Sequence, residues 1–184
     1  VLDEDTLGYD NDVIQLAFSP DGRTLAGVDW RGVVRLWSTL NGQELTPWSL
    51  RQASAGFLLW SRDGREVIVA QRSGAVEAWN VATVSPVRRI DGFASAQLRS
   101  VALDSDATLW TTDGGELFGW ALESGDLRQV VEPVTGTVMA IDPTGRHALV
   151  ALSPVTFESR SIPDLDLEAS FTGTMQNVSL RGQD

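Results

Sequence analysis

A repeat of about 42 residues constrains the fold of this chain more than any other feature. Trp37, Trp79 and Trp120 occupy the same local setting, at spacings of 42 and 41 residues. A polar turn precedes each tryptophan at a similar distance, and a further turn, 142–145, follows at the same rhythm. Repetition at this interval predicts that one structural unit is built several times along the chain.

Short apolar runs between turns predict that each unit is a four-stranded antiparallel sheet. In the first unit the runs are 13–19, 24–28, 33–37 and 43–50. A Pro-Asp-Gly turn follows the first run and an Asn-Gly pair precedes the last, and both are strong reversal signals. A four-stranded unit of this period is typical of a β-propeller blade.

We therefore expect an all-β chain, residues 1–184, that forms a β-propeller segment. The four blades are expected at residues 12–50, 55–91, 96–132 and 136–172. Residues 1–8 are interpreted as the outer strand of a preceding blade, and 175–184 as the start of a following one. No helical pattern is long enough to predict a helix.

The segment 12–38 carries a family resemblance. Its Val-Ile-Gln-Leu-Ala-Phe-Ser-Pro-Asp-Gly-Arg-Thr-Leu-Ala and Val-Val-Arg-Leu-Trp-Ser stretches resemble a bacterial-type WD40 repeat. The resemblance covers nearly the whole chain, strongly in the first two blades and weakly in the fourth. It implies a propeller that usually closes with seven blades, and loops on one face that dock partners.

The chain also departs from the WD40 pattern. The family's Gly-His before a blade becomes Gly8-Tyr9 and Gly92-Phe93, and its turn aspartate becomes Arg31 or Ser73. The family's hydrogen-bond network of serine or threonine, aspartate, histidine and tryptophan is therefore completed in no blade. We expect apolar packing to hold the blades together instead.

Strand edges and blade faces at the two ends of the repeat lack neighbours in this sequence. One interpretation is a segment of a longer propeller, and the other is a chain that closes by pairing with a copy of itself. In both cases residues 1–184 made alone are expected to self-associate, because repeat arrays need a cap or closure.

Charge and composition exclude several partners. The net charge is −11 and all 14 basic residues are arginine, without any basic run. A phosphate backbone or an anionic membrane surface would be repelled, so neither nucleic acid nor membrane is expected as a partner. There are no cysteines and no apolar run of about 18 residues, which favours a cytoplasmic protein without disulfides.

No residue pattern predicts catalysis, a metal or a cofactor. His147 is the only histidine, and it begins a predicted strand without a recognisable nucleophile motif. The acidic clusters 3–5, 10–12 and 164–168 lack the glycine turn and distal glutamate of a calcium loop, and are interpreted as solvated faces.

The candidate functional surface is formed by loops. Trp37, Trp79 and Trp120 are expected in the core, whereas Trp30 lies between charges in a loop and is either an interface anchor or a cover for a neighbouring blade. The loops on that face carry aromatic, arginine and acidic residues that suit a protein or peptide partner. The predicted partner-binding residues are Tyr9, Asp29, Trp30, Arg31, Arg72, Phe93 and Asp113, with Asp10 and Asp12 beside them.

Two functions follow from these observations. The first is a non-catalytic protein-interaction scaffold or sensor segment, part of a larger multidomain WD40-repeat protein. The alternative is a fragment of an enzyme-like or quinoprotein-type propeller, because residues 121–126 resemble the Ala-Leu-Asp-x-x-Thr-Gly turn of such blades. Both are analogies at the level of the family.

Overall fold

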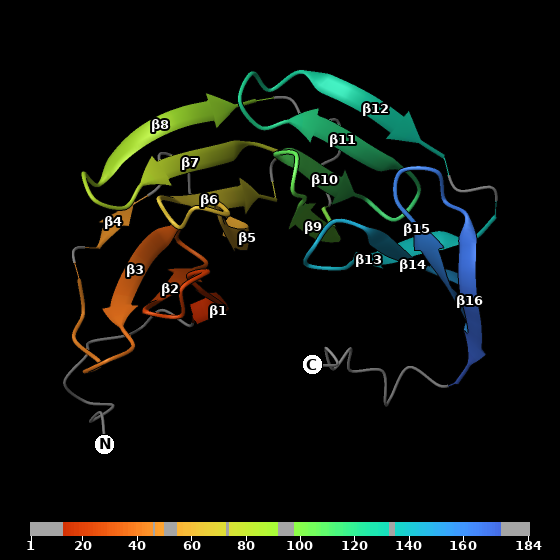
Figure 1. Ribbon diagram of the computed structural model, residues 1–184, viewed down its shortest axis with the longest axis horizontal. Helices are drawn as coiled ribbons and strands as arrows, with labels where there is room; N and C mark the ends of the chain where they lie inside the picture. The colour runs from red at the N-terminus through yellow and green to blue at the C-terminus, as the bar shows by residue number, and fades with distance from the viewer. Residues whose placement is uncertain are drawn as a thin grey trace. The chain divides into compact units, whose positions relative to one another are not determined.

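The regular secondary structure of the described residues consists of β-strands. The structure, a computed structural model, describes residues 13–45, 47–49, 55–72, 74–91, 98–132 and 135–173. Sixteen strands in these residues form four antiparallel four-stranded sheets, each with its strands in chain order (Figure 1). We call these sheets blades 1 to 4. The predicted all-β fold with four strands per blade is confirmed.

The chain divides into two compact units, Val1–Gln97 and Leu98–Asp184, with two blades in each. In unit 1, blade 1 comprises β1 (Val13–Phe18), β2 (Thr24–Asp29), β3 (Val33–Ser38) and β4 (Trp48–Ser49), and blade 2 comprises β5 (Ala55–Trp60), β6 (Glu66–Gln71), β7 (Val76–Asn80) and β8 (Ser85–Ile90). In unit 2, blade 3 comprises β9 (Ser100–Leu103), β10 (Thr108–Thr112), β11 (Leu117–Ala121) and β12 (Leu127–Val131), and blade 4 comprises β13 (Thr137–Ile141), β14 (His147–Ser153), β15 (Thr156–Ser161) and β16 (Leu167–Thr172).

The fourth strand of blade 1 is shorter than the sequence predicts. The expected strand covers residues 43–50, whereas β4 is limited to Trp48–Ser49 and Glu44 forms an isolated bridge with Trp37. Pro47 lies between these two paired segments. Proline has no backbone N–H to donate to a ladder, so regular pairing resumes only after it.

Short polar side chains set the first turn of blade 1. The Ser19 hydroxyl donates to Asp21 Oδ1 at 2.6 Å and accepts the N–H of Thr24 at 2.9 Å. Gly22 completes the turn with a φ of 69°, in the left-handed region that glycine adopts freely. The same turn recurs in blade 2, at Ser61, Asp63, Gly64 and Glu66.

These turns lower the pKa of their carboxyl groups. The Ser19 hydroxyl is the main cause that holds the pKa of Asp21 below its ordinary value, and the turn serine of blade 2 does the same for Asp63. In blade 4, burial raises the pKa of Asp142, but hydrogen bonds from Thr144 and from backbone N–H groups outweigh it, and the pKa falls. The ionised carboxylates thus stabilise the turns at neutral pH.

Blade 3 builds its first turn without glycine. Ala107 has a φ of 55°, in the same left-handed region as Gly22 of blade 1, in a turn that is one residue shorter. An L-residue in this region costs about 1–2 kcal/mol. Asp104 supports the turn, because its Oδ1 accepts the N–H groups of Asp106 and Thr108, each at 2.8 Å.

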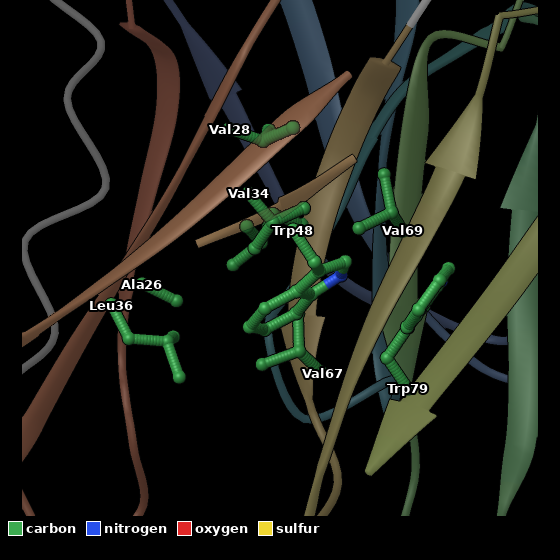
Figure 2. Packing of buried hydrophobic residues seen from close by; sticks show 9 residues of the cluster. Ala26, Val28, Val34, Leu36, Trp48, Val67, Val69 and Trp79 are labelled. Carbon is green, nitrogen blue, oxygen red and sulfur yellow. The ribbon is translucent and has the colours of Figure 1, made fainter. Parts of the chain in front are cut away.

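Unit 1 has its hydrophobic core between blades 1 and 2 (Figure 2). The indole rings of Trp48 and Trp79, one from each blade, are stacked with centroids 6.0 Å apart. Around them lie small and branched apolar side chains. Blade 1 contributes Ala26, Val28, Val34, Leu36 and Trp48, and blade 2 contributes Leu58, Val67, Val69 and Trp79.

Two hydrogen bonds also join these blades. The Nε1–H of Trp60 donates to the carbonyl of Ala17 at 3.0 Å, and Gln15 Oε1 accepts the N–H of Leu58 at 2.9 Å. We call the face of blade 1 that carries Ala26 and Val28 its trailing face, and the facing side of blade 2 the leading face of that blade. The two hydrogen bonds between these faces fix how blade 2 is aligned along blade 1.

Unit 2 repeats this arrangement with other residues. Its core is formed by Ala102, Trp110 and Leu117 of blade 3 with Val138, Ile141, Ala148, Val150 and Leu165 of blade 4. Ser100 Oγ accepts the N–H of Ile141 at 2.9 Å, as Gln15 accepts an N–H in unit 1. In both units a side chain of the first strand fixes the following blade.

Blade 4 carries an arginine at the repeat position of the tryptophans. Arg160 pairs with Ala148, as Trp79 pairs with Val67 in blade 2. The guanidinium group of Arg160 donates to Glu158 at 2.6 Å and to the carbonyl of Leu165 at 2.9 Å. Ionic and backbone contacts replace the indole at this position.

The tryptophans do not all lie in the core as predicted. Trp79 and Trp120 are buried, which confirms the prediction for these two. Trp37 is only partly buried, so the prediction is wrong for the first blade. The reason is its face: Trp37 lies on the leading face of blade 1, whereas blade 2 packs against the trailing face.

Candidate partner-binding surface

Five of the seven predicted partner-binding residues lie at the turns between the second and third strands of three blades. Asp29, Trp30 and Arg31 form the β2–β3 turn, and Arg72 holds the matching place in blade 2. Asp113 lies in the β10–β11 turn of unit 2. Tyr9 and Phe93, like Asp10 and Asp12, lie outside the described residues. Three of the candidates are consecutive residues of a single turn.

Trp30 is the exposed aromatic of this turn. Its side chain is 53% exposed, and the guanidinium carbon of Arg31 lies 5.1 Å from its ring centroid. The contact is a cation–π interaction between neighbours, which holds the ring and leaves much of its surface open.

Asp29 is buried beneath the turn, which its side chain stabilises by a hydrogen bond, and it does not belong to the exposed surface. It is only 3% exposed, contrary to the expectation of a contact residue. Its Oδ1 accepts the N–H of Val33 at 2.8 Å, and its carbonyl accepts the N–H of Gly32 at 3.0 Å. The side chain is a local turn acceptor of the kind that Asp and Asn provide. Asp29 thereby presents Trp30 and Arg31 on a rigid support.

Arg72 and Asp113 have different settings. Arg72 is exposed and follows Gln71, whose carbonyl accepts the N–H of Gly74 at 2.9 Å in an equivalent turn. Asp113 is half-buried, and its Oδ1 accepts the N–H of Gly115 at 2.8 Å. Arg72 is thus an exposed charge in the β6–β7 turn of blade 2, whereas Asp113 accepts a backbone N–H of its own turn.

A buried polar network in blade 2 was not foreseen from the sequence. Glu77 is 2% exposed, and its carboxylate accepts from Arg89 at 2.6 Å and from Gln71 at 3.2 Å. The other carboxylate oxygen accepts the Nε1–H of Trp79 at 3.1 Å. The signal in the sequence was the spacing of Glu77 and Trp79, two apart on one strand and hence on one face.

This network corrects the expectation that apolar packing alone replaces the family's hydrogen bonds. The indole N–H of Trp120 donates to Thr111 Oγ1 at 3.0 Å, and that of Trp110 donates to Asp104 Oδ2 at 2.9 Å. Buried donors require acceptors, because an unpaired one costs about 1–3 kcal/mol. Blades 2 and 3 therefore supply their own acceptors in place of the WD40 network, whereas the buried Nε1–H of Trp48 in blade 1 has no hydrogen-bond partner among the described residues.

The geometry around His147 is that of a strand end between acids. Its Nε2 lies 3.3 Å from Glu168 and its Nδ1 lies 3.8 Å from Asp142.

In the described ranges, no group of three or more histidine, cysteine, aspartate or glutamate side chains is arranged to hold a metal ion. Among the same residues, no helix is long and apolar enough to cross a membrane.

Residues 121–126, whose sequence resembles a quinoprotein turn, form a β-hairpin turn that recurs in other blades of this chain. In it, the N–H of Ala121 donates to Asp126 and the N–H of Gly125 donates to Ala121, each at 2.8 Å. The same pair of bonds joins residues 38–43 in blade 1 and 161–166 in blade 4. The shape of this turn is thus a property of the blade hairpin and favours no cofactor.

Four chain-ordered sheets with repeat-equivalent contacts define blades of the WD40 β-propeller fold. The crystal structure of the RRP9 WD40 repeats matches 90% of this chain with a TM-score of 0.71 and 18% identity. The structure of U3-55K matches 91% with a TM-score of 0.71 and 17% identity. At such identities the likeness is one of fold, and no family model matches the sequence. The chain spans 52% and 54% of those two chains.

Proposed function

We propose that this chain is a non-catalytic protein-interaction scaffold whose β2–β3 turn docks a protein or peptide. The single observation that carries the proposal is the exposed Trp30 ring with Arg31 on its face, held over the buried Asp29. Tryptophan and arginine are the residues most enriched among binding hot spots, and a rigid support reduces the entropy cost of docking.

The partner chemistry follows from this turn. An apolar recess would receive the indole, and a carboxylate beside it would pair with Arg31 at the rim. Arg72 adds a second exposed positive charge in the same unit. We therefore propose an acidic peptide or loop with at least one apolar anchor, although the chain as a whole carries a net charge of −11.

The proposal includes a larger assembly. The chain spans about half of the WD40 chains that it matches, which supports a scaffold that works with further blades, in a longer multidomain polypeptide or in a second copy. We place this scaffold in the cytoplasm, since its lack of cysteine removes any need for an oxidising compartment.

The test compares the proteins retained by the wild-type chain with those retained by Trp30→Ala, Arg31→Ala and Leu40→Ala. Leu40 is the matched control, because it is 93% exposed in the β3–β4 turn, away from the proposed surface. Partners lost with both Trp30→Ala and Arg31→Ala but kept with Leu40→Ala support the proposal. An unchanged set of bound proteins in all four samples contradicts it.

A further inference from the structure

A recess opens at the junction of blades 1 and 2, at the end of β2 opposite to the β2–β3 turn. It lies between the β1–β2 turn of blade 1 and the β5–β6 turn of blade 2, so both of its walls belong to unit 1. We call it the junction recess. Its volume is about 340 Å³. A cavity of about 150 Å³ is large enough for a benzene ring, so the junction recess has room for a bicyclic ring.

Rigid groups form the walls of the junction recess. The ring of Trp60 is held by its Nε1–H, which donates to the carbonyl of Ala17 at 3.0 Å, and Val81 packs with it against the core of unit 1. Gly64 and Pro20 bring the two turns together, because a Cβ added to Gly64 would lie 3.5 Å from Pro20 Cδ. A recess that is formed in advance lowers the entropy cost of binding.

Unit 2 fills the equivalent place with a tryptophan of its own. The strand registers place Trp110 at the repeat position of Ala26. Gly145 holds the place of Gly64, since its N–H donates to the first residue of its turn at 2.9 Å, as that of Gly64 does. A Cβ added to Gly145 would lie 3.1 Å from Cδ1 of Trp110. The indole therefore lies directly against the turn that borders the recess in unit 1.

The other contacts of Trp110 also correspond to walls of the junction recess. Its Nε1–H donates to Oδ2 of Asp104, which is the residue after β9 as Ser19 is the residue after β1. Trp110 shares its core cluster with Ile141, at the repeat position of Trp60. Blade 2 thus carries the larger side chain on its wall, and a recess remains beside it because blade 1 supplies alanine where blade 3 supplies an indole.

The junction recess also offers an acceptor for an indole N–H. The Ser19 hydroxyl and the N–H of Arg23 both donate to Oδ1 of Asp21, at 2.6 and 3.0 Å. Within the described ranges no donor contacts the second carboxylate oxygen, Oδ2, and Asp21 lines the recess. An N–H that donates to a carboxylate forms a stronger bond than one that donates to a neutral acceptor.

We propose that the junction recess binds the indole ring of a tryptophan presented by a partner protein. The ring packs against Trp60 and Val81 and donates its N–H to Asp21 Oδ2, as Trp110 donates to an aspartate in unit 2. Arg62 lies on the same rim, so a neutral ring is favoured over a cationic side chain. The site lies at the other end of β2 from the β2–β3 turn and does not depend on the function proposed for that turn.

The test measures fluorescence anisotropy of a labelled, capped Gly-Trp-Gly peptide that is titrated with residues 1–184. Saturable binding is expected. Two unlabelled competitors probe the chemistry on the wild-type chain: one carries phenylalanine in place of tryptophan, and the other carries 1-methyltryptophan, which keeps the ring and lacks the N–H. Each is expected to compete about tenfold or more less well than the unlabelled tryptophan peptide, because the hydrogen bond to a charged acceptor is lost.

Three variants locate the binding site. The double variant Ala26→Trp, Trp60→Ile gives unit 1 the aromatic arrangement of unit 2, and it is expected to stay folded by circular dichroism and to lose the peptide. Asp21→Asn keeps the acceptor oxygen of the turn, replaces Oδ2 by an N–H₂ group, and is expected to bind about tenfold more weakly. Val87→Ala, on the exposed outer strand of blade 2, is expected to bind like the wild type.

The competitors and Asp21→Asn decide the matter even where the double variant unfolds. Absence of saturable binding would overturn the proposal. Equal competition by the tryptophan and 1-methyltryptophan peptides, or unchanged affinity in Asp21→Asn, would do the same. A folded double variant that still binds the peptide would place the indole elsewhere and overturn it as well.

Discussion

Blades 1 and 2 place the same residue type at the same repeat position and obtain different environments from it. Trp79 is buried, stacked on Trp48 and hydrogen-bonded to Glu77, whereas Trp37 is partly exposed and lines an open groove. The strand, the register and the neighbouring turn are alike in the two blades. The difference arises from the adjacent blade, because burial in a repeat protein depends on the neighbour as well as on the repeat itself.

The largest expected effect separates the two tryptophans. Trp79→Ala should lower the free energy of unfolding by about 3–5 kcal/mol, since it empties a packed core position. Trp37→Ala should lower it by only about 1–2 kcal/mol, because part of the side chain remains in water. Equilibrium urea unfolding of the two variants measures both. Equal losses would mean that the leading face of blade 1 is covered in solution.

The next effect concerns the residue two positions before each tryptophan. Glu77→Ala should cost about 2–3 kcal/mol, because Arg89 and the Trp79 indole lose a buried acceptor. The equivalent residue in blade 1 is Arg35, whose ion pair with Glu44 is half-exposed. Arg35→Ala should therefore cost about 0.2–1 kcal/mol. Urea unfolding again measures the pair, and a larger loss for Arg35→Ala would contradict the comparison.

Substitution of the turn glycines, unlike the substitutions above, should lower the free energy of unfolding equally in blades 1 and 2. Gly22 and Gly64 share a φ of 69°, and an added Cβ would meet nothing closer than 3.5 Å at either position. Each change to alanine should cost about 1 kcal/mol through φ alone.

Ala107→Gly in blade 3 is the reverse change and should add up to about 1 kcal/mol. Thermal unfolding of the three variants provides the measurement. A clear difference in stability loss between Gly22→Ala and Gly64→Ala would show that the neighbouring blade also affects these turns.

The smallest effect is electrostatic and should again be equal in blades 1 and 2. Asp21 and Asp63 have lowered pKa values, chiefly because a serine hydroxyl donates to each. A lowered folded pKa contributes stability above the ordinary carboxyl pKa of about 3.9, and that stability is lost as the pH falls through the folded value.

Carboxyl-carbon NMR titration should find both pKa values below the ordinary value. Ser19→Ala should raise the pKa of Asp21 and leave that of Asp63 unchanged. A pKa of Asp21 that does not respond to Ser19→Ala would remove the hydroxyl as its cause.

Local signals made most of the fold predictable. The 42-residue spacing, the Ser-x-Asp-Gly turns and the Asn-Gly hairpin identify sixteen strands to within a few residues, apart from β4, where Pro47 interrupts pairing. Periodicity and turn chemistry act over a few residues and are therefore visible in the sequence.

The candidate surface was less predictable, because it depends on orientation and burial. The sequence placed Asp29 and Trp30 in one loop but could not assign which of them points outward. An aspartate that accepts backbone N–H groups and one that faces a partner look the same in the sequence. The hydrogen-bond acceptors of the Trp79 and Trp120 indoles are different residue types in the two blades, so no repeated sequence motif predicts them.

The stacked pair of Trp48 and Trp79 gives this chain a spectroscopic reporter of its own assembly. The two rings belong to different blades and lie at an interplanar angle of 28°. Their electronic transitions couple only while the blades are in contact, which produces a paired positive and negative band in circular dichroism. Loss of this couplet would report separation of blades 1 and 2 without any label.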